Sequence, residues 1–189
     1  MNRIVFASLI LVMSIVDSFG QSMKITANGF VDFEDTSKKY IVLEFPNIPK
    51  DRLFLETIKF INANYPRPEE NTNVMENEQI VINGHDWIKV GLGFFSGGID
   101  IDAQYYYKYD LQFRDGKIRF EPLFDCLKFE SGTTISLVGK KSFGGGTSGL
   151  FNEKGKIISD KEVILVDQQI NNFIHSLMKK ITSMTNESW

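Results

Sequence analysis

Apolar and polar residues alternate most regularly in the middle of the chain. Apolar side chains occupy every second position over residues 105–113, with polar side chains between them. Asp115-Gly116 follows, and this pair is typical of a two-residue type I′ turn, which needs positive φ at both positions. If Arg114 pairs with Lys117, the apolar side chains of both strands fall on one face. The pattern therefore predicts an antiparallel hairpin with one buried face and one wet face.

Two other segments show helical spacing. After Pro49, which suits a first helical turn, apolar residues recur three and four apart up to Tyr65. Ser159 and Glu162 have the spacing of a capping box, and the apolar residues that recur over residues 163–184 fall within an arc of about 100°. A stripe of this width must pack against apolar surface, and the apolar face of the hairpin is the obvious partner.

The remaining patterns complete the predicted architecture. Residues 39–45 form a compact apolar run that fits a strand, and the glycine-rich residues 133–150 predict a flexible loop. Residues 21–37 are predicted as an N-terminal arm or a short extra strand, and residues 38–185 as a single domain. The predicted fold class is α+β: a curved antiparallel sheet with two helices packed on one face, in the order β-α-β(n)-α.

Residues 1–20 have the layout of a secretory signal peptide. Arg3 supplies a positive charge, residues 4–16 are almost wholly apolar, and small residues precede a predicted cut before Gln21. The apolar stretch is shorter than the about 20 residues that a transmembrane helix needs. We therefore expect an exported protein, periplasmic or secreted, with no transmembrane segment after signal cleavage.

Several stretches resemble a family of exported proteins best known from gut Bacteroidetes. They are the run Phe45–Asp51, the helix that follows it to Tyr65, and the strand, turn and return strand from Tyr107 to Phe120. The resemblance is to DUF4468, a family of unknown function with a TATA-binding-protein-like (TBP-like) fold. It implies that fold and export, it carries over no catalytic residues, and it does not imply DNA binding. The glycine-rich stretch near residues 139–149 departs from the family pattern.

Composition and charge exclude several classes of function. The chain has 21 basic and 24 acidic residues, a net charge of −3 and no long basic run, so we expect no nucleic-acid partner. Cys126 is the only cysteine, which excludes an internal disulfide and a multi-cysteine zinc site. Its spacing from Phe120 and Phe124 predicts a thiol buried in the core.

A few polar residues are candidates for chemistry, but each has a plainer interpretation. His85 and Asp86 are neighbours on a strand, so they point to opposite faces and do not form a dyad. His175 lies away from the apolar stripe and is expected to be exposed. Asp100 and Asp102 lack the rest of a calcium loop. We therefore predict no metal site, no cofactor and no enzymatic activity, because no acid, base and nucleophile occur at catalytic spacing.

Tyr105, Tyr107 and Tyr109 form a row on one face of the predicted sheet, and Phe124 shares that face. One interpretation of this row is core packing. The other is a ligand-binding site for a small amphipathic molecule between the sheet and the C-terminal helix, because tyrosine suits a surface that is apolar at one end and wet at the other.

Two functional hypotheses follow. The first is a non-enzymatic exported domain that binds a protein or envelope partner through the exposed polar face of its sheet. The second is a binder of a small amphipathic ligand at the tyrosine row.

Overall fold

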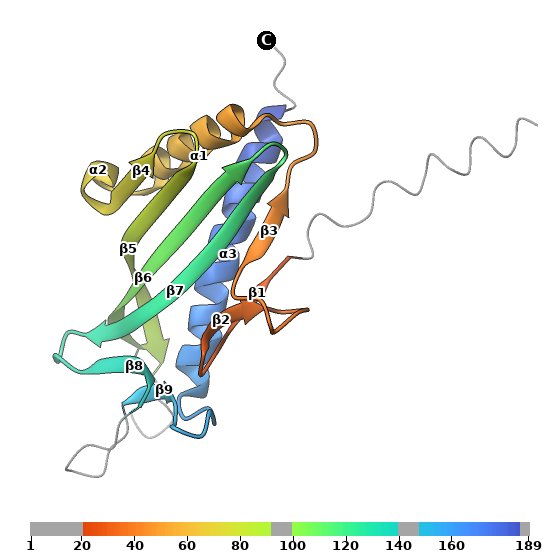
Figure 1. Cartoon of the computed structure of the whole chain (residues 1–189). Helices are drawn as coiled ribbons and strands as arrows, with labels where there is room; N and C mark the ends of the chain where they lie inside the picture. The colour runs from red at the N-terminus through yellow and green to blue at the C-terminus, as the bar shows by residue number, and fades with distance from the viewer. Residues whose placement is uncertain (1–20, 92–99, 140–147, 186–189) are drawn as a thin grey trace, which may run out of the picture.

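The computed structural model describes residues 21–91, 100–139 and 148–185, which form two sheets and three helices (Figure 1). The signal peptide predicted at residues 1–20 lies outside the described residues. The main sheet has the order β4-β5-β6-β7-β8-β9. Strand β3 pairs with residues 117–120 at the start of β7, and β8 pairs with residues 126–128 near its end. Its strands are β3 (Ile41–Glu44), β4 (Thr72–Met75), β5 (Gln79–Gly91), β6 (Asp100–Arg114), β7 (Lys117–Phe129), β8 (Thr134–Val138) and β9 (Gly149–Phe151).

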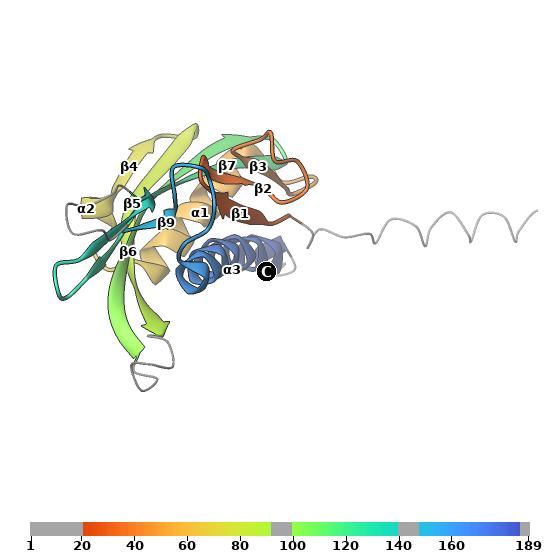
Figure 2. The ribbon, with the colours of Figure 1, turned by 90° about the horizontal axis from the view of Figure 1, so that it is seen from below.

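Two long helices cover one face of this sheet, as predicted. Helix α1 (Lys50–Asn64) and helix α3 (Asp160–Thr185) both lie on its concave side, which we call the inner face (Figure 2). The rings of Phe60 and Phe173 meet edge to face between the two helices, 5.8 Å apart. A third, short helix, α2 (Pro68–Asn71), precedes β4. Within the described part of the chain, no helix has an apolar run long enough to cross a membrane.

The stripe of α3 is buried as its spacing predicts. Its predicted members Val163, Val166, Ile170, Phe173, Ile174, Leu177 and Ile181 are buried, and so is Met178. The side chain of Met184, the last predicted member, lies outside the described residues. Ser159, predicted to cap the helix, donates its hydroxyl to the Gly149 carbonyl over 3.0 Å and so links the start of α3 to β9.

The central hairpin has the predicted register. Arg114 lies opposite Lys117, and the inward-facing pairs follow from it, with Leu111 opposite Phe120. The turn differs in type, because only Gly116 has positive φ. Asp115 instead uses its side chain, since its carboxylate accepts the backbone N–H of Lys50 over 2.9 Å. Asp115 thereby caps the start of α1 from a turn that is distant in sequence. Pro49, at the N-cap position, has no side-chain group that could accept this hydrogen bond.

Residues 21–37 fold as a hairpin of β1 (Met23–Thr26) and β2 (Gly29–Asp32). Met23 and Phe30 belong to the same hydrophobic core as the main sheet. Side chains of α3 bond to the free edge of β1. Asn171 accepts the N–H of Met23 and donates to its carbonyl, and Asp167 accepts the N–H of Ile25 over 2.6 Å.

The prediction of one flexible loop over residues 133–150 is wrong at both of its ends. Residues 134–138 and 149–151 form β8 and β9, which pair in parallel. The two strands come so close that a Cβ on Gly149 would collide with the backbone of Gly139. Residues 140–147, with most of the glycines, lie outside the described residues.

The prediction that Cys126 is in the core is also wrong. The pairing of β6 with β7 shifts register between Tyr106 and Tyr107, so that Phe124 lies opposite Tyr107 and Cys126 opposite Tyr106. A bulge of this kind inserts one residue and reverses the alternation beyond it. Cys126 therefore lies half-buried on the outer face of the sheet, and Leu127 takes the core position.

Candidate functional site

The structure brings the four predicted ligand-binding residues together on the inner face. Tyr105, Tyr107, Tyr109 and Phe124 have exposed fractions of 0%, 3%, 1% and 6%. Ring centroids of neighbouring tyrosines are 5.0 and 4.1 Å apart, and Phe124 stacks on Tyr105 at 6.0 Å. Phe173 of α3 lies 4.6 Å from Tyr109. The row thus packs as core under α3, and its role in ligand binding stays a prediction.

Gly84 makes room for this row. It lies directly opposite Tyr107 on β5, and a Cβ added there would come within 2.7 Å of the Tyr107 ring. Only glycine lets the ring lie across the backbone of the neighbouring strand.

A small polar cluster borders the tyrosine row. The Tyr107 hydroxyl donates to the Tyr65 hydroxyl, at the end of α1, over 3.3 Å, and it also interacts with the Asp86 carboxyl. Burial raises the pKa of Asp86 and raises the pKa of Tyr65 to about 12. Burial also raises the pKa of Tyr107, so both hydroxyls keep their protons at neutral pH and act as hydrogen-bond partners rather than as bases.

Tyr105 differs from its neighbours in this cluster. Its hydroxyl is buried and makes no hydrogen bond of normal geometry to the described residues, although the Tyr109 hydroxyl interacts with it. A buried hydroxyl without a well-formed hydrogen bond carries a desolvation penalty.

The other candidates stay apart. His85 is exposed on the outer face and stacks on Tyr106, while Asp86 points inward, so the two do not form a dyad. His175 is exposed on α3. Asp100 and Asp102 lie on β6, and the described residues contain no group of three His, Cys, Asp or Glu side chains placed to hold a metal ion.

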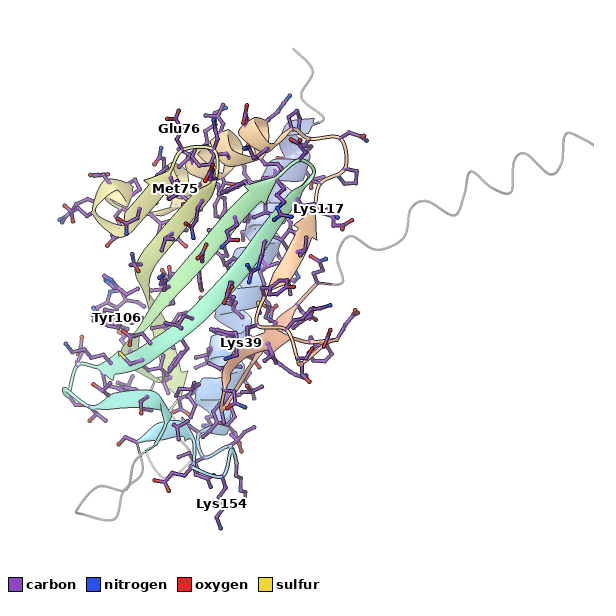
Figure 3. The ribbon with its side chains drawn as sticks, in the orientation of Figure 1. Lys39, Met75, Glu76, Tyr106, Lys117 and Lys154 are labelled. Atoms are coloured by element: carbon purple, nitrogen blue, oxygen red, sulfur yellow. The ribbon has the colours of Figure 1, made fainter. Side chains whose placement is uncertain are left out.

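The outer face of the main sheet carries a feature that the sequence analysis missed. No helix of the described residues crosses this face, which is turned toward the viewer in Figure 3, with Tyr106 and Lys117 labelled on it. Trp87 on β5 is 57% exposed and Leu123 on β7 is 58% exposed. With His85 and Tyr106 they form the outer patch, which spans three neighbouring strands.

A signal for the outer patch is present in the sequence. Trp87 precedes the core residue Ile88 and Leu123 precedes the core residue Phe124, so alternation places both Trp87 and Leu123 outward. Large apolar residues at outward positions of a strand are the signal that sequence reasoning could have used.

Comparison with solved structures identifies the fold. The chain is similar to a DUF4468 family protein from Bacteroides ovatus, with a TM-score of 0.54 and 10% identity over 75% of this chain and 84% of that one. It also matches a TBP-like protein from Parabacteroides distasonis, with a TM-score of 0.48 and 14% identity over 79% of this chain and 92% of that one. No family model and no curated protein matches the sequence.

At 10% identity the likeness to the first of these structures establishes the fold and nothing finer. The α+β fold class predicted from the sequence is confirmed, and the resemblance to DUF4468 is confirmed at the level of the fold. The chain has the fold of a DUF4468 family protein.

Proposed function

We propose that this chain is an exported, non-catalytic domain of the DUF4468 family that binds a partner protein through the outer face of its main sheet. One observation carries the proposal: Trp87 and Leu123 are more than half exposed on the outer face of the main sheet, which no helix of the described residues covers (Figure 3). Large exposed apolar side chains that cluster on a soluble domain mark interaction surfaces.

The surroundings of the outer patch fit a protein partner. Lys89, Lys108 and Lys128 are exposed on the same face, and Gln104 accepts a hydrogen bond from the Tyr106 hydroxyl over 2.7 Å. An apolar and aromatic centre with a polar rim is the usual anatomy of a protein–protein interface. Tryptophan and tyrosine are also the residues that contribute most to binding at such centres.

Export and the absence of catalysis are parts of the same proposal. Residues 1–20 support export, to the periplasm or out of the cell, because of their charge and hydropathy pattern. The inner-face cluster supports a non-catalytic role, since its tyrosines hold their protons at neutral pH and are packed in the core.

A second candidate function is favoured by the Tyr105 hydroxyl. A small amphipathic ligand that entered between the sheet and α3 would supply a hydrogen bond of better geometry to this buried group. Entry would require α3 to move away from Tyr109, because Phe173 occupies that space.

Native mass spectrometry of the mature protein, purified from its own host, separates the two functions. If the outer face binds a partner protein, the spectrum should show the mass of the protein alone or of a complex with another protein, with no small molecule bound. A co-purified small molecule of defined mass would contradict this and support ligand binding at the tyrosine row, provided that Tyr105→Phe lowers its occupancy.

A further inference from the structure

A hollow of about 420 Å³ lies on the outer face where β3, β6 and β7 meet. Its lining consists of Tyr40, Val42, Gln112, Arg114, Lys117 and Arg119. All three charged side chains are cations, and among the described residues no carboxylate lines the hollow. We propose that it binds the carboxylate of an acidic side chain in the partner protein, an inference that rests on the proposed function.

Arg119 is held in a fixed orientation. Its guanidinium lies over the Tyr40 ring, 4.1 Å from the centroid, and donates to Glu121 over 2.7 Å and to Gln112 over 3.3 Å. These contacts hold the planar guanidinium in place and so fix the shape of this part of the hollow.

Arg114 supplies the free charge. Lys117 pairs with Glu44 over 3.2 Å, and Arg119 pairs with Glu121, so two of the three lining cations are already neutralised from the rim. Arg114 is exposed and its side chain forms no ion pair within the described residues. It also borders a second hollow, which Glu78 lines, without pairing with that residue. One unpaired guanidinium fits one incoming carboxylate, which it can bind with two parallel hydrogen bonds.

The apolar part of the lining suits a glutamate side chain. Val42 and the Tyr40 ring provide a surface for the methylene groups that carry a glutamate carboxylate. The hollow lies on the same sheet face as the outer patch, and Gln112 and Tyr106 project from the same strand. A partner segment that covers the outer patch could therefore place an acidic residue in the hollow.

The test is a titration of the isotope-labelled mature protein with penta-glutamate at low ionic strength, followed by amide chemical shifts. Penta-glutamine and trigalacturonate are the parallel ligands. The expected result is shifts at Gln112, Arg114, Lys117 and Arg119 with penta-glutamate only, weakened by salt. Arg114→Glu should raise Kd at least about tenfold, because it places like charges together. Lys154→Glu, at an exposed position far from the hollow (Figure 3), makes the same change of charge and should alter Kd less than about twofold.

Three outcomes would overturn the inference: no shifts with penta-glutamate, equal weakening by Arg114→Glu and Lys154→Glu, or binding of trigalacturonate alone. The amide spectrum itself reports whether each variant is folded, and the milder Arg114→Gln should still weaken binding about threefold. If penta-glutamate fails to bind but a partner still crosslinks to position 87 of the outer patch, the carboxylate site is wrong and the proposed function stands.

Discussion

At the scale of single residues, Gly84 and Tyr107 depend on each other. The ring of Tyr107 occupies the space that any side chain at position 84 would need. A close contact of this kind across two strands fixes both the register of β5 against β6 and the position of the tyrosine row.

We predict that Gly84→Ala destabilises the protein by about 1–3 kcal/mol, the usual cost of overpacking. The cost should shrink in a Tyr107→Leu background, because the ring atoms that the new methyl meets are then gone. Urea unfolding of the two single variants and the double variant measures this coupling. Strictly additive costs would contradict the account.

Asp167 links stability to pH. Burial raises the pKa of its carboxyl from 3.8 to about 6 in the folded protein. The folded state therefore holds this proton more tightly than the unfolded chain, so stability falls as pH rises from about 4 through 6. Burial of Asp86 acts in the same direction.

The wild-type protein should accordingly be less stable at pH 7.5 than at pH 5. Asp167→Asn should reduce that difference, because an amide oxygen can still accept the Ile25 N–H without carrying charge. Urea unfolding at both pH values checks this, with the exposed Glu153→Gln as the control variant. An unchanged pH difference in Asp167→Asn would show that Asp167 is not responsible.

At the scale of elements, local patterns predicted the long helices and the central hairpin because their apolar spacing is regular over many residues. The 114–117 pairing follows directly from alternation around a two-residue turn. The bulge in β7 could not be predicted, because no residue type or spacing within β7 indicates an inserted residue. Only the pairing of β7 with β6 shows it. Strands β8 and β9 were missed because they are short and because they pair with each other in parallel across a glycine-rich stretch.

The bulge predicts opposite sensitivities for two adjacent residues. Leu127→Ala should cost about 2–5 kcal/mol, since it empties a fully buried position. Cys126→Ala should cost much less, because that side chain lies half-buried on the outer face. Denaturant unfolding of the two variants tests this. A larger loss of stability in Cys126→Ala than in Leu127→Ala would contradict the bulge and support the register expected from simple alternation.

At the scale of the whole molecule, the two faces of the sheet differ in what covers them. The sequence predicted that the tyrosines share a face, but whether that face is a pocket depends on how α3 is placed, which no local pattern contains. Phe173 fills the space beside Tyr109, and the core is continuous there. The outer patch and the cationic hollow remain as surface features, and they combine residues from strands that only the folded sheet brings together.

The most direct test of the outer face as the partner surface is photocrosslinking in the native host. A photoreactive residue replaces Trp87 on the outer face or, as the matched control, Lys179, an exposed residue of α3 on the opposite side of the sheet. The account predicts one discrete protein adduct from position 87, none from position 179, and loss of the adduct when Leu123→Asp is added. Equal adducts from both positions, or none from position 87, would contradict it.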